Sequence, residues 1–214
     1  LLRANPKIFI GYSDMTALHL YLYRRFGWVT FHGPMAAKDL AGGAEHYDCD
    51  SLLAALTQTQ PIGEIKASNT EMLHQASGQV VSGRLLGGCL SLIAAMMGTP
   101  DEPDTRGAIL FLEDVGEEPY RIDRMLTQLR LAGKFDQAAG VIFGDCLDCT
   151  ASEYKPFVAA GFTLGEVLDA ILGSLKVPVL SGLTIGHVEN QLTLPLGVTA
   201  KLDAVAGRVL KVTA

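Results

Sequence analysis

A strand, a helix and a second strand follow one another near the start of the chain, and this order constrains the fold most. Residues 7–11 predict a short buried strand, residues 14–26 an amphipathic helix and residues 29–31 another strand. Strand–helix–strand units form parallel sheets, whose two faces must both be covered by other elements. Two strands and one helix cannot cover both faces. We therefore interpret residues 1–40 as the remnant of an N-terminal parallel α/β domain whose other strands precede residue 1.

A second domain is expected after a stretch in which the pattern weakens. Residues 41–78 contain glycine and proline interruptions and one helix over residues 50–58 with Asp50 as its N-cap, so we interpret them as an interdomain connection. Residues 79–214 predict a C-terminal mixed α/β domain. Its expected elements are strands at residues 108–112, 140–143 and 177–180, helices at residues 119–131 and 164–175, and antiparallel strands at residues 192–196 and 200–212.

Composition argues against several classes of protein. The 214 residues are 49% hydrophobic and 19% charged, which is enough apolar material for a core, and the formal net charge is −6. A mildly acidic chain without a basic run does not favour nucleic acid or an anionic membrane as a partner. No apolar stretch is long enough to span a bilayer, and we expect a cytoplasmic protein, with a homodimer left open.

Four cysteines raise the question of metal or redox chemistry. Cys146 and Cys149 form a C-x-x-C pair, but a structural zinc site needs four ligands, and no second pair stands at a suitable spacing. With Cys49 and Cys89 as the other two, we expect four reduced thiols, no metal and no cofactor.

The turn after the first strand, Gly11-Tyr12-Ser13-Asp14, carries the strongest candidate for chemistry. A serine between a buried strand and a helix lies on a sharp turn that exposes its hydroxyl at the helix N-terminus. The backbone N–H of Asp14 would then point to where an oxyanion forms. The same residues also suit a helix N-cap without chemistry, and Met15 stands where the pattern G-x-S-x-G has its second glycine.

Two further residues can complete a catalytic triad with Ser13. Glu113 follows the predicted strand at residues 108–112, at the end where parallel sheets bind ligands. His187 lies in a glycine-flanked loop, a setting that suits catalysis better than a core position. A carboxylate can orient an imidazole, and the order serine, acid, histidine is that of the α/β-hydrolases. Taken singly, Glu113 also fits a charge ahead of the next helix and His187 a solvated loop histidine.

Short motifs along nearly the whole chain belong together. They are Pro6-Lys7-Ile8-Phe9-Ile10-Gly11-Tyr12-Ser13-Asp14, Phe31-His32-Gly33-Pro34-Met35, Gly87-Gly88-Cys89-Leu90, Gly98-Thr99-Pro100, Leu112-Glu113-Asp114, Arg121-Ile122-Asp123-Arg124-Met125-Leu126, Gly186-His187 and Leu194-Pro195-Leu196-Gly197. In this order they resemble the L,D-carboxypeptidase family of serine peptidases, whose relatives include the microcin C self-immunity hydrolases. The family's fold carries the serine in an N-terminal α/β domain and the other two catalytic residues in a C-terminal domain.

The resemblance implies a catalytic triad of Ser13, Glu113 and His187, without a metal. The family removes a terminal D-amino acid that follows an L-centre, typically D-alanine of the murein tetrapeptide during cell-wall recycling. The substrate would be a murein tetrapeptide or a related muropeptide. Its free carboxylate would need a cationic side chain, for which Arg84 and Arg121 are candidates by sequence position.

Two departures from the family's pattern bear on activity. The family has further strands and a glycine-rich segment before the point where this chain starts, so we expect the chain to be poorly active or to need a complementary N-terminal fragment. Cys89 stands where relatives commonly have asparagine in a G-G-N-L segment. A thiol is a weaker hydrogen-bond partner than a carboxamide, so any contact of that asparagine would be altered.

Two other functions stay open. An immunity-type hydrolase of peptidyl- or aminoacyl-adenylates would need an aromatic residue to stack on the nucleobase, and the single tryptophan, Trp28, lies where a strand begins. An inactive fragment would act only as a binding module.

Overall fold

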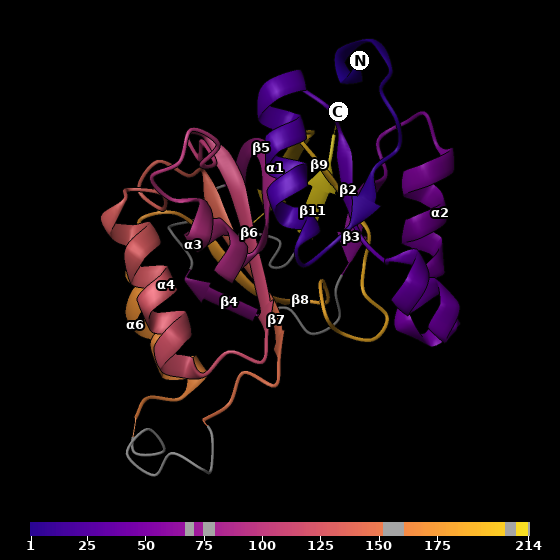
Figure 1. Cartoon of the computed structure of the whole chain (residues 1–214). Coiled ribbons are helices and arrows are strands. Elements are labelled where there is room, and N and C mark those ends of the chain that lie inside the picture. Colours follow the sequence, from indigo (N-terminus) through magenta and orange to yellow (C-terminus); the bar gives the residue numbers. More distant parts are fainter. Residues whose placement is uncertain (67–70, 75–79, 152–160, 204–208, 214) are drawn as a thin grey trace.

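The protein folds into two sheets of unequal size that are flanked by helices (Figure 1). The computed structural model describes residues 1–66, 71–74, 80–151, 161–203 and 209–213. Within these residues, the large sheet has eight strands in the order β3-β11-β10-β5-β6-β7-β8-β4, and the small sheet has three in the order β1-β2-β9. The mixed α/β class expected from the sequence is confirmed.

The strands and helices have the following bounds. The small sheet is built from β1 (Ile10–Gly11), β2 (Thr30–His32) and β9 (Leu194–Leu196). The large sheet is built from β3 (Gly63–Lys66), β4 (Glu71–His74), β5 (Val80–Cys89), β6 (Ala108–Val115), β7 (Gly140–Leu147), β8 (Val179–Leu183), β10 (Thr199–Asp203) and β11 (Val209–Val212). The α-helices are α1 (Met15–Phe26), α2 (Cys49–Thr57), α3 (Leu90–Met96), α4 (Pro119–Leu131) and α6 (Leu164–Ile171), and the short helical turns are η1 (Leu2–Ala4), η2 (Ala36–Leu40) and η3 (Ala44–His46).

The small sheet contains the strand–helix–strand unit expected near the start of the chain. β1 and β2 are parallel, with Gly11 opposite His32, and α1 connects them. β9 pairs with the other side of β2 in antiparallel orientation, with Pro195 opposite Phe31. A segment that the sequence places in the C-terminal domain therefore completes the sheet that leads into Ser13.

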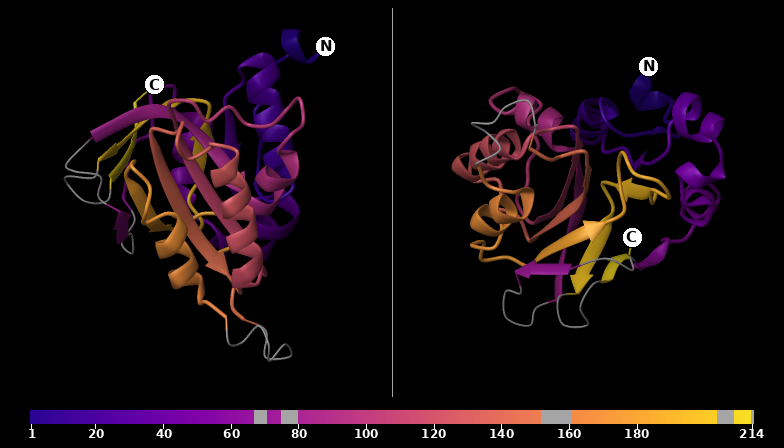
Figure 2. Two further views of the ribbon diagram at one scale, coloured as in Figure 1. Left: turned by 90° about the vertical axis from the view of Figure 1, so that its left-hand side faces the viewer. Right: turned by 90° about the horizontal axis from the view of Figure 1, so that it is seen from below.

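Four parallel strands, β5 to β8, form the centre of the large sheet and separate two apolar cores. Leu110 and Leu112 of β6 belong to the core under α3, α4 and α6, whereas Ile109 and Phe111 belong to the core that includes residues of β9 and β10. Figure 2 shows α4 and α6 side by side along the outer face of the sheet. The carboxyl ends of the parallel strands meet at one edge, called here the carboxyl edge.

The segment expected to be only a connection contributes strands to the large sheet. β3 and β4 are its two outermost strands, paired with β11 and β8. Each is four residues long, which is too short for an alternating pattern to stand out in the sequence. The helix in this segment begins earlier than expected, because the Asp48 carboxylate accepts a hydrogen bond from Ser51 N at 2.7 Å. Asp48, and not Asp50, is therefore the N-cap of α2.

The remaining helices follow the sequence prediction closely. α4 occupies residues 119–131 as predicted, and Gly133 follows it in the left-handed conformation at φ +70°. α1 begins one residue later than predicted, after Asp14, and α6 ends at Ile171 rather than at residue 175. In the part of the chain that the structure describes, no helix is both long and apolar enough to cross a membrane.

Candidate active site

A carboxylate and an imidazole are paired at the carboxyl edge of the large sheet. Glu113 lies near the end of β6, opposite Cys89 of β5, and its Oε2 is 3.0 Å from Nδ1 of His187. The Glu113 side chain is fully buried and His187 is nearly so. Burial raises the pKa of Glu113, and the hydrogen bond from His187 opposes that rise. Because Nδ1 is engaged by the carboxylate, Nε2 is the ring nitrogen that can act on a substrate.

Gly186 makes room for this pair. A side chain at this position would place its Cβ 2.0 Å from Glu113 Oε2, so it would overlap the carboxylate oxygen that pairs with His187. Gly186 also has a φ of +85°, a left-handed conformation that glycine adopts without strain. The Gly-His order in the sequence is therefore a packing requirement of the buried carboxylate.

Ser13 lies on the turn between β1 and α1, in a backbone conformation that is costly for serine. Its φ is +59°, whereas Asp14, the N-cap of α1, already has helical angles. The turn is closed by bonds from Met15 N to Tyr12 O at 3.2 Å and from Thr16 N to Ser13 O at 2.9 Å. Strained residues of this kind gather at functional sites, where the surrounding structure holds them in place.

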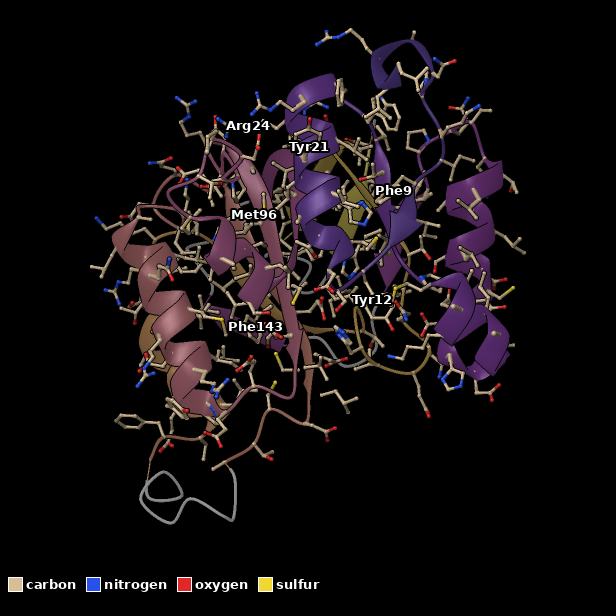
Figure 3. The ribbon with its side chains drawn as sticks, viewed as in Figure 1. Phe9, Tyr12, Tyr21, Arg24, Met96 and Phe143 are labelled. Carbon is tan, nitrogen blue, oxygen red and sulfur yellow. The ribbon has the colours of Figure 1, made fainter. Side chains whose placement is uncertain are left out.

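Tyr12 connects the serine turn to the imidazole. Its side chain is fully buried, and its ring lies edge-on to the His187 ring with 4.8 Å between the centroids. Figure 3 places Tyr12 below α1, where the chain leaves β1. The residue next to Ser13 therefore packs directly against the histidine that pairs with Glu113. Residues from the two sheets, far apart in the sequence, meet at this one place.

A second contact fixes α1 against the large sheet. The Cys89 backbone N–H donates to Thr16 Oγ1 at 3.0 Å, and Thr16 is fully buried. A Cβ on Gly88 would lie 2.4 Å from the same oxygen, so this approach requires glycine. Cys89 acts through its backbone here, and burial raises the pKa of its thiol to about 12. The Cys89 side chain is therefore a neutral thiol.

Two buried histidines lie behind the turn, and sequence reasoning did not single them out. His32 is fully buried between Tyr12 and Phe111, and burial lowers its pKa to about 3. His19 is buried on α1 with Nε2 2.8 Å from Gly11 O, and burial lowers its pKa to about 4. Only their positions could have indicated this in the sequence, because each histidine falls at a place in its helix or strand where the side chain faces the core.

The structure does not bring Arg84 to the buried pair. Arg84 is opposite Ala108 in the sheet, whereas Cys89 is opposite Glu113, so the two ends of β5 are about 17 Å apart. Its guanidinium donates to Gly197 O at 2.9 Å. The sequence suggested Arg84 by position alone, and position in the sequence does not reveal that it lies where β5 begins to pair with β6, at the amino end of this pairing.

Arg121 lies in the first turn of α4 and has partners of its own. Its Nη1 is 3.5 Å from Glu117 Oε2, its Nε donates to Tyr120 Oη at 3.2 Å, and half of its side chain is exposed. This is the surface pairing that an exposed arginine commonly makes.

Within the residues that the structure describes, the C-x-x-C pair has no further side chains beside it that could complete a metal site. The interaction between the two thiols lowers the pKa of Cys149 and raises that of Cys146, and the Cys149 Sγ donates to Leu147 O at 3.5 Å. All four cysteines are free thiols. Among the described residues, no group of three or more histidine, cysteine, aspartate or glutamate side chains is placed to hold a metal ion.

A mixed α/β fold in which a buried Glu113–His187 pair lies beside the turn of Ser13 is an arrangement that serine hydrolases use. Residues 82–202 match the LD-carboxypeptidase C-terminal domain, and residues 1–33 match the LD-carboxypeptidase N-terminal domain. The chain belongs to the LD-carboxypeptidase family.

Named relatives and solved structures agree with this membership. A Bacillus subtilis protein named "Probable murein peptide carboxypeptidase" is 44% identical over 152 residues, covering 70% of this chain and 46% of the relative. The microcin C7 self-immunity protein MccF of Escherichia coli is 32% identical over 182 residues, covering 72% of this chain and 53% of that protein. The crystal structure of muramoyltetrapeptide carboxypeptidase from Oxalobacter formigenes superposes with a TM-score of 0.83 and 32% identity, covering 100% of this chain and 70% of that one. The chain thus spans about half the length of these two curated relatives.

Proposed function

We propose that this protein is a serine carboxypeptidase that removes the terminal D-alanine from a murein tetrapeptide. The observation that carries the proposal is the buried Glu113–His187 pair, which packs through Tyr12 against the turn of Ser13. The names of the Bacillus relative and of the Oxalobacter structure support the substrate class. A cytoplasmic role in cell-wall recycling follows from that substrate.

The chemistry would proceed through an acyl-enzyme. His187 Nε2 takes the proton of Ser13 Oγ, and the oxygen attacks the carbonyl that precedes the D-residue. The tetrahedral oxyanion accepts a hydrogen bond from the Asp14 backbone N–H at the start of α1. His187 then gives its proton to the departing amine, so D-alanine leaves and a water molecule, activated in the same way, releases the tripeptide.

Glu113 would hold the imidazole in one orientation and stabilise its positive charge. The carboxylate fixes the proton on Nδ1, which leaves Nε2 free to accept the proton of Ser13. In a fully buried site the attraction between carboxylate and imidazolium is little screened, so the pair becomes more favourable when His187 is protonated.

Replacing Gly186 with alanine is expected to lower kcat/KM by about 100-fold or more, because its methyl group would displace the Glu113 carboxylate. Gly165→Ala is the matched control: a Cβ there meets nothing within 4 Å, and alanine favours the helix. Kinetics and urea unfolding of both variants measure the effect. Wild-type turnover in Gly186→Ala would contradict a role for the pair.

A second candidate function is hydrolysis of a peptidyl- or aminoacyl-adenylate, which the resemblance to the self-immunity protein MccF suggests. MccF in complex with glutamyl sulfamoyl guanosine also superposes with a TM-score of 0.83. Trp28, however, precedes β2 at the end opposite to the serine turn, and its ring lies 6.1 Å from that of Phe26. It is therefore poorly placed to stack on a base near His187, and we rank this function second.

The test compares three substrates and one probe. We expect the protein to release D-alanine from L-Ala-γ-D-Glu-meso-diaminopimelate-D-Ala, but not L-alanine from the peptide with the terminal L-epimer, and not to hydrolyse an aminoacyl-adenylate. A fluorophosphonate, which reacts with activated serines, should label Ser13 as located by peptide mapping. Hydrolysis of the adenylate alone would favour the second function, and absence of both turnover and labelling would favour a binding module.

A further inference from the structure

A pocket of about 460 Å³ lies beside His187. The residues that line it are Lys38, Asp39, His46, Leu147, His187, Val188 and Glu189. Its volume is in the range of small-molecule sites. Of the described residues that line it, Lys38 is the one with a permanently charged cationic side chain.

The ammonium group of Lys38 is held in place by the residue that contacts His187. Lys38 Nζ donates to Tyr12 Oη at 2.9 Å, and Tyr12 Oη donates to Asp39 Oδ1 at 3.1 Å. Asp39 is buried, and its other oxygen accepts a hydrogen bond from Met35 N at 2.7 Å. Both Asp39 oxygens thus accept hydrogen bonds, one from Tyr12 and one from Met35. The bond to Tyr12 uses one of the three N–H donors of Lys38.

The distance from Lys38 to the imidazole suits a single amino-acid residue. The Tyr12 ring lies 4.8 Å from the His187 ring and 5.4 Å from Lys38 Nζ, so the ammonium lies at most about 10 Å from the centre of the imidazole. A terminal carboxyl carbon lies about 4 Å from the carbonyl carbon before it. With about 3 Å for a polar contact at each end, one residue needs a span of about 10 Å, which this upper limit allows.

We propose that Lys38 binds the free α-carboxylate of the substrate's last residue, so that this pocket receives the residue to be released. The inference rests on the proposed function and assigns the cation that Arg84 and Arg121 do not supply. It explains why the site would cleave one residue from a chain end, because a peptide bond in the middle of a chain offers no carboxylate to Lys38. The hydrogen bond to Tyr12 raises the pKa of Lys38, which keeps the ammonium charged at neutral pH.

Two substrates that differ only at the terminal group test this role. Wild-type protein is expected to hydrolyse the tetrapeptide free acid about 10- to 100-fold more efficiently than its C-terminal carboxamide, the effect of one hydrogen bond between charged groups. Lys38→Met should reduce that ratio to near one, mainly through a higher KM for the acid. Lys38→Arg should restore a preference, and Lys201→Met, which removes an exposed lysine on β10, should keep the wild-type ratio.

A purely structural role for Lys38 predicts a different pattern. If Lys38 only supported Tyr12, Lys38→Met would lower kcat/KM for acid and amide by the same factor, and the proposal would be overturned. Equal hydrolysis of acid and amide by the wild type would also overturn it. Binding of both peptides to Ser13→Ala, measured by calorimetry, tests Lys38 without turnover. Tighter binding of the acid that Lys38→Met abolishes would support it even if the proposed reaction failed, and equal affinities would contradict it.

Discussion

Replacement of Ser13 by alanine is expected to lower kcat/KM for D-alanine release by about 10⁴-fold or more, since loss of a triad nucleophile removes the covalent route. Alanine keeps the Cβ and the strained φ of +59°, so the free energy of unfolding should change by less than about 0.5 kcal/mol. Peptide kinetics, fluorophosphonate labelling and urea unfolding measure the three effects. Retained turnover would contradict the assignment of Ser13 as nucleophile.

Ser13→Gly separates catalysis from strain. Glycine adopts a positive φ without a steric penalty, so this variant should be about 1 kcal/mol more stable than Ser13→Ala, although both lack activity. A gain of this kind would identify the serine turn as a place where stability is given up for function. Equal stability of the two variants would mean that the turn stores no strain.

Acidification from pH 7 to pH 5 is expected to remove about 4 kcal/mol of stability through His32 and His19. Burial holds the pKa of His32 at about 3 and that of His19 at about 4, below the ordinary value of 6.5. Below pH 6.5 the unfolded chain binds protons that the folded protein does not, so stability falls as the pH falls towards the folded values. At pH 5 each histidine contributes a loss of about 2 kcal/mol.

A single substitution apportions this loss. His32→Phe keeps a ring against Phe111 but cannot be protonated, so the drop in unfolding free energy between pH 7 and pH 5 should shrink by about 2 kcal/mol. Urea unfolding at both pH values measures it, and comparison with the wild type at pH 7 corrects for altered packing. An undiminished drop in the variant would show that His32 is not the group that titrates.

The parts of the fold that the sequence predicted are those specified by local pattern. The strand–helix–strand unit and α4 have clear periodicity and turn signals, and Glu113 could be placed at the carboxyl edge because β6 is a continuous apolar run. The parts that were missed depend on distant partners. β3 and β4 are defined by β11 and β8, and nothing within four residues indicates that pairing.

The same distinction applies to the candidate site. Ser13, Glu113 and His187 carry local signals of turn, strand end and glycine-flanked loop, and the structure brings the last two into contact. Lys38 has no such signal, since its position follows from the η2 turn and from the buried hydroxyl of Tyr12. Arg84 was a reasonable candidate by position, but only the register of β5 reveals which end of the sheet it occupies.

The pairing of β9 with β2 has a consequence for the order of assembly. β2 joins β1, the strand before Ser13, to β9, whose residues 194–196 follow Ser13 only after a long stretch of chain. Ribosomes add residues at about 5–20 per second, so the nucleophile turn emerges many seconds before the strand that completes its sheet. His187 also emerges long after Ser13, so synthesis itself keeps the nucleophile and its base apart until all the residues between them have been made.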